Sequence, residues 1–498
     1  DAIMMYLEDF VDGNKFFKLA QQVTAKKPII LLKPGTSSEA KKAISSHTGS
    51  IAQDSKIVKT ALTQSGCLQV ETVEELFDIT KLLSWQPALR GNNIAVVTNA
   101  GGVGIQTVDD LERNGLNVTT LDKATEKELA SELPKEANIH NPIDVLGDAL
   151  ADRYKEVLNT VMEDKNVDGI LVILTPQQVT QSLLTARYVN EIADAHQKTV
   201  VTSFVGGESI EDAVALLAQE KIPQFDYPND AARALGLTWI WAKRKSNVEK
   251  ITEGQHKFPT IVNSALKGSK RNHMVDLKLA QSIFIKHDLP LLPSVVSDDL
   301  EVLEQGARNM NYPVVLKLVH PGLIHKTEFK AVRLDIKDKK ELDEQYRELK
   351  KIAAKAKLNG AKYEVQPFIK DKLELIIGIK KDEDQILELK GRKYIKNKGF
   401  GHFLIFGAGG IYAEVYEDVS LRMFPLNEYE IREMISETKV SKILRGARGK
   451  SYNEKGVVEF LLKLNELIAK NNNIREVDIN PLFVSENNVY IADLKLFA

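Results

Sequence analysis

Short apolar runs alternate with amphipathic stretches along the first half of the chain. The runs AIMMYLE (2–8) and KPIILLK (27–33) are typical of buried strands in a parallel sheet. The same pattern continues between residues 93 and 207, with the runs NIAVVTNAGG, LNVTTLD, VDGILVILTP and KTVVTSFVGG. Strands that alternate with helices predict doubly wound parallel sheets of the α/β class, which bind ligands at the carboxyl ends of their strands.

The pattern changes after KRKSNVEKITEGQHKFPT (243–260), a polar stretch that we expect to be a linker. A helix over VDLKLAQSIFIKHD, the strand PVVLKLVH and a final strand pair, EVDINPLFV and NVYIADLKLF, are typical of an α+β domain. The predicted division is three domains, at 1–88, 89–243 and 259–498, with a linker at 244–258.

Composition and charge narrow the possible functions. The chain has 498 residues, a net charge of −2 and 43% hydrophobic residues, so no overall basic field attracts nucleic acid. No run of about 18 apolar residues predicts a membrane span. The single cysteine, Cys67, excludes an intrachain disulfide and fits a reducing cytoplasm. Because the sequence opens on Asp1 within a predicted strand, we expect that preceding sequence is missing.

One histidine stands among small residues in KKAISSHTGS (41–50). A capped turn would explain the serines and threonine around His47, so the segment alone does not identify a site. Glu8 ends the first predicted strand. Glu8 and His47 could therefore both reach one edge of the same sheet. A carboxylate beside an imidazole orients the ring and suits nucleophilic attack on phosphorus, although an ordinary acid at a strand end remains an alternative.

A glycine-rich turn connects a strand to a helix in TNAGGVGIQTVDDLERNG (98–115). The backbone N–H groups at Gly101 and Gly102 could bind an anion at the positive end of the helix dipole, or the turn could simply be tight. The spacing is not GxGxxG, which disfavours a dinucleotide cofactor such as NAD. The turn-like segment NPID (141–144) is uninformative by itself.

The last third of the chain carries more polar residues near its predicted strands. Lys317 lies on a strand that leads into a loop with His325. Asp478 and Asn480 are two apart and therefore share one face of a strand, which Asp493 also shares if the intervening turn has an even number of residues. Three oxygen ligands suit Mg²⁺ bridging nucleotide phosphates, whereas a solvent-facing polar hairpin is the alternative.

Several motifs occur together in a fixed order along the chain: YLE, KPIILLKPGTSSEAKKAISSHTGSIA, VVTNAGGVGI, NPID, VILTPQ, PVVLKLVHPGLIHKTE, VQPFI, LIFGAGGIYAE and EVDINPLFV. In this order the sequence resembles the NDP-forming acyl-CoA synthetases, the ADP-forming acetate–CoA ligase group related to succinyl-CoA synthetase. The resemblance covers essentially the whole chain.

This resemblance implies a fold and a reaction. Residues 1–88 would be the latter part of a flavodoxin-like ligase domain, 89–243 a second flavodoxin-like domain and 259–498 an ATP-grasp domain. Family members also carry an N-terminal CoA-binding domain, which we expect to be missing here. The implied reaction is acyl-CoA + ADP + phosphate ⇌ acid + CoA + ATP, with Mg²⁺, on a small carboxylic or hydroxycarboxylic acid. A cytoplasmic homodimer is expected.

The resemblance also assigns roles to individual residues. His47 would carry the phosphoryl group, Glu8 would stabilise the phosphohistidine, and His325 would pass phosphate on to ADP. The remaining residues would bind phosphate or substrate (Gly49, Asn99, Gly101, Gly102, Asn141), the nucleotide (Lys317, Gln366, Glu374, Glu414) and the metal (Asn480, Asp493).

Two segments depart from the family pattern. The segment HKTEFKAV stands where the family usually has HKTEVGGV. The loop after His325 therefore lacks the family's paired glycines. The stretch QILELKGRKYIKNK (385–398) is longer and more basic than the family's link, and we expect a surface hairpin of the ATP-grasp lid.

Two other classes of protein remain as alternatives. An ATP-grasp carboxylate–amine ligase would use an acyl phosphate directly and would not need His47. A non-catalytic acyl-CoA or nucleotide sensor would tend to lose that histidine. The sequence leaves open which acid is used and whether ADP or GDP is preferred.

Overall fold

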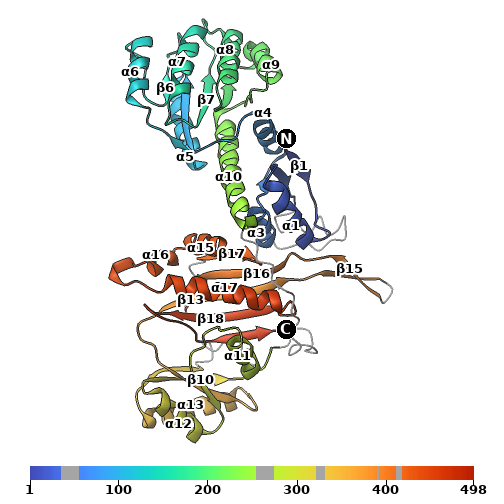
Figure 1. Cartoon of the computed structure of the whole chain (residues 1–498), viewed down its shortest axis with the longest axis vertical. Helices are drawn as coiled ribbons and strands as arrows, with labels where there is room; N and C mark the ends of the chain where they lie inside the picture. Colours follow the sequence, from blue (N-terminus) through green and yellow to red (C-terminus); the bar gives the residue numbers. More distant parts are fainter. Residues whose placement is uncertain (35–54, 254–273, 321–330, 390–391, 411–417) are drawn as a thin grey trace. The chain divides into compact units, whose positions relative to one another are not determined.

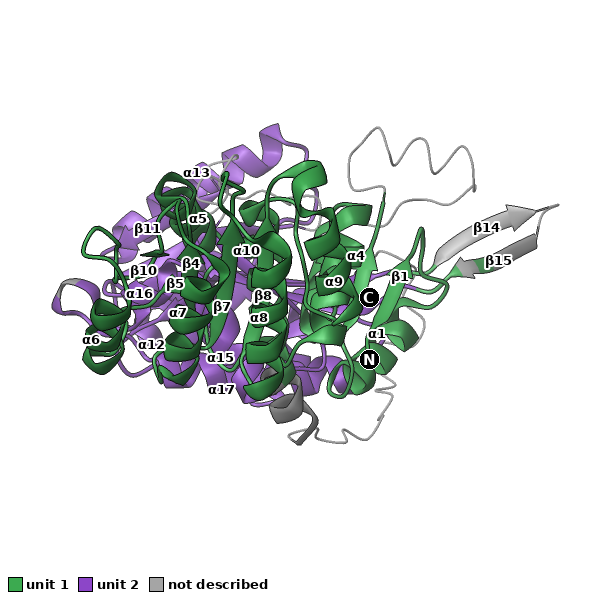
Figure 2. Cartoon of the chain, turned by 90° about the horizontal axis from the view of Figure 1, so that it is seen from above, with its two compact units in different colours: residues 1–253, 384–398 green, residues 254–383, 399–498 purple. Residues whose placement is uncertain are grey.

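The computed structural model describes residues 1–34, 55–253, 274–320, 331–389, 392–410 and 418–498. The chain forms two compact units (Figures 1 and 2). Unit 1 comprises Asp1–Glu253 together with Asp384–Lys398, and unit 2 comprises Gly254–Glu383 together with Gly399–Ala498. The first of these units combines two parallel sheets and a two-stranded antiparallel hairpin, and the second combines two antiparallel sheets.

A small parallel sheet opens unit 1. Its strands, in the order β1-β2-β3, are β1 (Ile3–Tyr6), β2 (Ile29–Leu32) and β3 (Leu68–Val70). The helices around it are α1 (Gly13–Thr24), α3 (Ser55–Gln64) and α4 (Val73–Trp85). The run IILL of β2 is wholly buried, as expected for a central parallel strand. The prediction of burial is wrong for β1, where Met4 is 44% and Tyr6 61% exposed, because β1 is an edge strand of the described sheet.

A larger parallel sheet follows in the order β5-β4-β7-β8, with β6 paired to β4. Its strands are β4 (Asn93–Thr98), β5 (Asn117–Val118), β6 (Ile143–Asp144), β7 (Gly169–Leu174) and β8 (Thr199–Phe204). The connecting helices are α5 (Gly101–Arg113), α6 (Lys123–Glu132), α7 (Ala151–Glu163), α8 (Ser182–Ala195) and α9 (Glu211–Gln219), with a 3-10 turn at Gly207–Ile210. Alternate residues of β4 enter two different cores, Ala95 and Val97 on one face and Ile94 and Val96 on the other. The doubly wound α/β fold is therefore confirmed.

One hydrophobic core connects the two sheets of unit 1. Ile30 of β2, Val96 of β4 and Trp241 of helix α10 (Pro228–Glu253) belong to the same cluster of buried residues. Residues 244–253, which the polar pattern predicts as linker, continue α10. No glycine or proline interrupts this stretch before Gly254, so its sequence can stay helical.

Two antiparallel sheets form unit 2. The smaller sheet has the order β11-β10-β12-β9, with β9 (Val295–Ser297), β10 (Val314–Val319), β11 (Val332–Ile336) and β12 (Lys362–Pro367). The larger has the order β17-β16-β13-β18-β19, with β20 also paired to β18. Its strands are β13 (Leu373–Asp382), β16 (Gly401–Ala408), β17 (Val419–Met423), β18 (Glu476–Val484), β19 (Val489–Ile491) and β20 (Leu494–Phe497).

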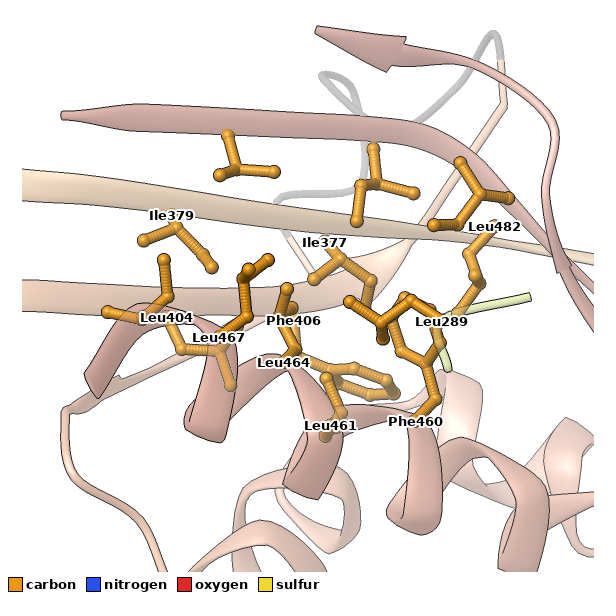
Figure 3. Packing of buried hydrophobic residues seen from close by; sticks show 14 of the residues in the cluster. Leu289, Ile377, Ile379, Leu404, Phe406, Phe460, Leu461, Leu464, Leu467 and Leu482 are labelled. Atoms are coloured by element: carbon orange, nitrogen blue, oxygen red, sulfur yellow. The ribbon is translucent and has the colours of Figure 1, made fainter. Parts of the chain in front are cut away.

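Helices cover these sheets. They are α11 (Leu277–Ile285), α12 (Leu300–Met310), α13 (Lys339–Lys355), α15 (Glu428–Ser436), α16 (Val440–Leu444) and α17 (Glu454–Lys470), with a 3-10 turn at Ala447–Gly449. Leu461, Leu464 and Leu467 of α17 recur at helical spacing and pack against the larger sheet, in a core with Ile377 and Phe406 (Figure 3). This α+β arrangement agrees with the predicted class of the C-terminal domain.

The basic insertion forms the expected hairpin, from strands β14 (Gln385–Leu389) and β15 (Arg392–Asn397). Residues 384–398 belong to compact unit 1, although they follow β13 of unit 2 in the sequence, and their place in an ATP-grasp lid stays a prediction. Within the described part of the chain, no helix is both long enough and apolar enough to cross a membrane.

Candidate active site

Glu8 and Lys33 lie just beyond the carboxyl ends of neighbouring parallel strands, β1 and β2. The Leu7 N–H donates to the Leu32 carbonyl at 3.1 Å, which extends the register of the sheet toward this edge. Lys33 Nζ donates to the Glu8 carbonyl oxygen at 2.6 Å, while the Glu8 side chain is exposed. The segment 35–54, with His47 and Gly49, lies outside the described residues, so the pairing of Glu8 with His47 stays a prediction.

Gly101 and Gly102 begin helix α5 directly after β4, at the carboxyl edge of the larger parallel sheet. The backbone at Ala100 caps the helix without a side-chain hydrogen bond. A Cβ on Gly101 would lie 2.7 Å from Asp144 Oδ2, so a larger residue there would require this carboxylate to shift. A Cβ on Gly102 would meet open space, so this side of the helix start can be approached by an anion.

Asp144 is a polar residue of this edge that the sequence reasoning missed. It ends β6 beside Thr98 of β4, and its Oδ1 accepts the Leu146 N–H at 2.9 Å. A carboxylate next to the first turn of α5 is favourable for the helix dipole. It also places a negative charge beside the predicted phosphate position, so a phosphoryl group would need to approach from the Gly102 side.

The amide side chains of Asn99 and Asn141 are engaged within the fold. Asn99 is buried and binds Thr175 twice through backbone atoms, with Nδ2 donating to the carbonyl at 2.8 Å and Oδ1 accepting the N–H at 2.9 Å. Asn141 accepts the Val96 N–H at 2.9 Å and donates to the carbonyls of Ile94 and Thr119 at 2.8 and 3.0 Å. The Asn99 contacts join residues just after β4 and β7, and the Asn141 contacts hold the backbone of β4 and the residue after β5. Substrate binding by either residue stays a prediction.

The polar cluster of unit 2 centres on Lys317, which is only 8% exposed on strand β10. Its Nζ donates to Gln366 Oε1 at 2.6 Å and to the Ala492 carbonyl at 2.7 Å. Gln366 Nε2 in turn donates to Glu364 Oε1 at 3.2 Å, and Glu364 is the cross-strand partner of Lys317. The structure therefore brings Lys317 and Gln366 together, and it adds Glu364, which the sequence reasoning had not selected.

This cluster connects the two sheets of unit 2, because Ala492 lies between β19 and β20 while Lys317 and Gln366 belong to the smaller sheet. A buried ammonium group is stable only where hydrogen-bond acceptors surround it. Such a preorganised cation between two sheets can bind a phosphate without first losing a hydration shell.

Glu374 lies on β13 next to the glycine-rich end of β16. Lys372 Nζ is 3.6 Å from Glu374 Oε1, and the Gly409 N–H donates to the Glu374 carbonyl at 2.8 Å. A Cβ on Gly409 would lie 2.6 Å from the Leu375 carbonyl carbon, and Gly410 has φ +86°, so both positions require glycine. Glu414 and His325 lie outside the described residues.

Asn480 and Asp493 lie on the half-buried face of the larger sheet in unit 2. Strand β18 pairs with β19 at Leu482–Ile491 and with β20 at Ile479–Leu494. Both pairs have the same register, so Asn480 lies opposite Asp493. Asp478 shares this face but is held by Lys495 at 3.0 Å, which reduces its availability to a cation.

An amide and a carboxylate fit Mg²⁺, which takes oxygen ligands and completes its shell with water and substrate phosphates. Across the described ranges, no group of three or more His, Cys, Asp or Glu side chains could hold a metal by itself.

Comparison with known proteins identifies these parts. A family model for a succinyl-CoA ligase like flavodoxin domain matches residues 1–83, one for a ligase-CoA domain matches 94–249, and one for an ATP-grasp domain matches 267–385 and 392–497. Flavodoxin-like ligase domains followed by an ATP-grasp domain define the class of acid–CoA ligases that use a nucleotide.

Two curated relatives extend the match over almost the whole chain. The chain is 32% identical over 506 residues to acetate–CoA ligase (ADP-forming) I of Archaeoglobus fulgidus, covering 100% of this chain and 70% of the relative. It is 29% identical over 501 residues to 4-hydroxybutyrate–CoA ligase (ADP-forming) of Nitrosopumilus maritimus, covering 98% of this chain and 68% of the relative. The chain belongs to the family of ADP-forming acyl-CoA synthetases, whose members are enzymes.

A solved structure from the same group is similar as well. It is the dinucleotide forming acetyl-coenzyme A synthetase 1 of Ca. Korarchaeum cryptofilum in complex with phosphate and ADP. The identity is 33%, the TM-score is 0.49, and the match covers 50% of this chain and 55% of that chain.

Proposed function

We propose that the protein interconverts acyl-CoA, ADP and phosphate with a free acid, CoA and ATP through a phosphohistidine at His47. The observation that carries the proposal is the 32% identity, over the whole of this chain, to an ADP-forming acetate–CoA ligase. The order of motifs around His47, the Gly101 helix start and the Lys317 strand supports the same reaction.

The reaction divides into three transfers. Phosphate displaces CoA from the acyl-CoA thioester, which gives an acyl phosphate and the CoA thiol. A ring nitrogen of His47 then attacks the phosphorus, so that the free acid leaves and phosphohistidine forms. In the last transfer the phosphoryl group passes, by way of His325, to the terminal phosphate of ADP, and both histidines are regenerated.

Each described residue has a separate task in this scheme. Glu8 orients the His47 ring and stabilises the phosphohistidine, and the N–H groups at Gly101 and Gly102 offset part of its negative charge. Asn99 and Asn141 hold the strand ends from which this edge is built. Gly49, which lies outside the described residues, is proposed to bind phosphate or substrate.

The nucleotide site is assigned to unit 2. Lys317 and Gln366 contact the nucleotide, Glu374 and Glu414 border it, and Asn480 and Asp493 would hold Mg²⁺. The metal would neutralise phosphate charge and orient the terminal phosphate for transfer.

The substrate is proposed to be a small carboxylic or hydroxycarboxylic acid. The two relatives named above act on acetate and on 4-hydroxybutyrate according to their names. We also propose a homodimer, which light scattering of the purified protein tests directly.

A panel of acids tests the proposal. Purified protein is incubated with ATP, CoA and Mg²⁺ and with acetate, propionate, 3-hydroxypropionate, 4-hydroxybutyrate or an aryl acetate. We expect ADP and an acyl-CoA to form together with at least one small acid, and His47→Ala to abolish both. Acyl transfer to an amine in place of CoA would indicate a carboxylate–amine ligase, and nucleotide binding without turnover would indicate a sensor.

A further inference from the structure

The hairpin β14–β15 is joined at both ends to strands of unit 2, yet its base pairs with the loop between β1 and α1 in unit 1. The Lys398 N–H donates to the Val11 carbonyl at 2.9 Å, and the Gly13 N–H donates to the Lys398 carbonyl at 3.0 Å. These two bonds form a parallel bridge at Asp12. The insertion therefore ends on the loop that directly follows Glu8.

A buried side-chain contact lies beside this bridge. Asn397 Nδ2 donates to Asp9 Oδ2 at 2.6 Å, and Asn397 is only 6% exposed. The other carboxylate oxygen, Asp9 Oδ1, accepts the Phe10 N–H at 2.8 Å. Phe10 is 2% exposed, and its ring meets the Phe16 ring edge-on at 4.8 Å between centroids. Asn397 is thus connected, through Asp9, to a firmly packed residue of the loop.

A second contact supports the hairpin base. Lys398 Nζ lies 3.4 Å from Asp12 Oδ2, while Asp12 Oδ1 caps helix α1 through the Lys15 N–H at 2.9 Å. The hairpin base therefore contacts both the loop and the first turn of the helix that follows it.

Glu8 lies between two anchors. Lys33 holds its carbonyl on one side, and Asp9 is held by Asn397 on the other. Because the Glu8 side chain is exposed, its direction depends on the backbone that these anchors fix. A shift of this backbone would move the carboxylate relative to the edge of the sheet where the segment with His47 begins.

We propose that Asn397 is a positioning residue for Glu8, so that the hairpin inserted into the ATP-grasp sequence sets the geometry of the phosphohistidine site. The inference rests on the proposed function, because it uses the role assigned to Glu8. In this inference the 384–398 insertion acts at the histidine site. No contact between the insertion and the nucleotide is needed.

A reciprocal exchange tests this contact in the full chain. Asn397→Asp places two carboxylates at the 2.6 Å contact, whereas Asp9→Asn combined with Asn397→Asp restores one donor and one acceptor. In the double variant, the amide oxygen introduced at position 9 can still accept the Phe10 N–H. The matched control is Asn117→Asp, an exposed asparagine in the same unit whose side-chain contact is long at 3.5 Å.

The main measurement is the rate of His47 phosphorylation from phosphate and the acyl-CoA of an acid that the substrate panel identifies. We expect Asn397→Asp to slow it about tenfold, since small misplacements of catalytic groups have large kinetic effects. The double variant should return to within about twofold of wild type, as coupled neighbours do. The KM for ADP should stay unchanged, because the nucleotide residues are in unit 2.

A second readout does not depend on activity. Hydrogen exchange of the backbone amides in residues 7–13 should be faster in Asn397→Asp and normal again in the double variant. If Asn397→Asp cannot be purified, Asn397→Ala and the double variant supply the same comparison.

The outcomes separate this inference from the function on which it rests. An unchanged phosphorylation rate in Asn397→Asp, or a loss that the double variant does not restore, overturns the positioning role. Glu8→Gln is the reference: if it also leaves the rate unchanged, the role assigned to Glu8 itself is wrong. If Glu8→Gln slows phosphorylation and Asn397→Asp does not, only the positioning role is rejected.

Discussion

The two candidate sites hold their polar groups in opposite ways. In unit 1, Glu8 is exposed on a loop and Gly102 opens a helix into free space. In unit 2, Lys317 is 8% exposed and its ammonium group is already bound by Gln366 and the Ala492 carbonyl. An exposed carboxylate can contact a histidine that a separate segment carries. A buried cation that is already hydrogen-bonded is suited to a ligand that binds at one fixed position. This difference agrees with a phosphoryl relay between two sites. One site would receive the segment that carries His47, and the other would bind the nucleotide.

The largest effect is expected from Lys317→Met. In the proposed site, losing one charge-assisted hydrogen bond from this ammonium group to the nucleotide phosphate, worth about 2 kcal/mol, should lower kcat/KM for ADP about thirtyfold. Phosphorylation of His47 from acetyl-CoA and phosphate should remain near the wild-type rate. Lys351→Met is the matched control, because Lys351 is an exposed lysine of unit 2 that pairs with Glu348 on the same helix. Equal losses in both half-reactions would show that the two sites are not separate.

A buried histidine in unit 2 predicts that the free energy of unfolding depends on pH. Burial lowers the pKa of His402 to about 4 from 6.5, and its Nε2 lies 2.6 Å from the Ile474 carbonyl. The unfolded chain therefore binds more protons between pH 6.5 and 4, so stability falls by up to about 3 kcal/mol across this range as the pH is lowered. Urea unfolding followed by circular dichroism, at a series of pH values, measures the effect.

His402→Gln keeps an N–H donor for Ile474 but does not titrate. The pH dependence between 6.5 and 4 should therefore be weaker in this variant than in wild type. Identical profiles for the two proteins would contradict the assignment to His402.

Asn141→Ala tests whether the polar groups of unit 1 bind substrate or hold the sheet. Losing three hydrogen bonds to strand backbone should lower the free energy of unfolding by about 2 kcal/mol. The three tryptophans, Trp85, Trp239 and Trp241, all lie in unit 1 and report its unfolding by fluorescence. The KM for the acid should change little. A large rise in this KM with unaltered stability would instead make Asn141 a substrate ligand.

Lys33→Met should have the smallest effect. Lys33 is half-buried and donates to a backbone carbonyl, so its loss should slow His47 phosphorylation only about threefold. Rapid-quench measurement of the labelled protein checks this. An effect as large as that of Lys317→Met would mean that the unit 1 site is as rigidly prepared as the unit 2 site.

The sequence predicted the elements well where the pattern is local. The run IILL predicts β2, and the glycine pair at 101–102 predicts the start of α5, because each depends on neighbouring residues. Burial of β1 was predicted wrongly, since the same apolar run can lie at the centre or at the edge of a sheet.

The missed features depend on partners far away in the chain. Asn99 contacts Thr175, Lys317 contacts Ala492, and Asn397 contacts Asp9 across 388 positions. No periodicity in one sequence indicates such pairs. For this reason the hairpin at 385–397 could be expected from its departure from the family pattern, whereas the unit that it joins could not.

The central claim is that a phosphoryl group passes through His47. The most direct test is to incubate the protein with ³²P-phosphate and the acyl-CoA of an acid that the substrate panel identifies, locate the label by mass spectrometry, and then add ADP. We predict label on His47 that ADP removes as ATP, no label in His47→Asn, and wild-type behaviour in His140→Asn, which alters an exposed histidine of the same unit. ATP formation by the His47→Asn protein at the wild-type rate would contradict the account.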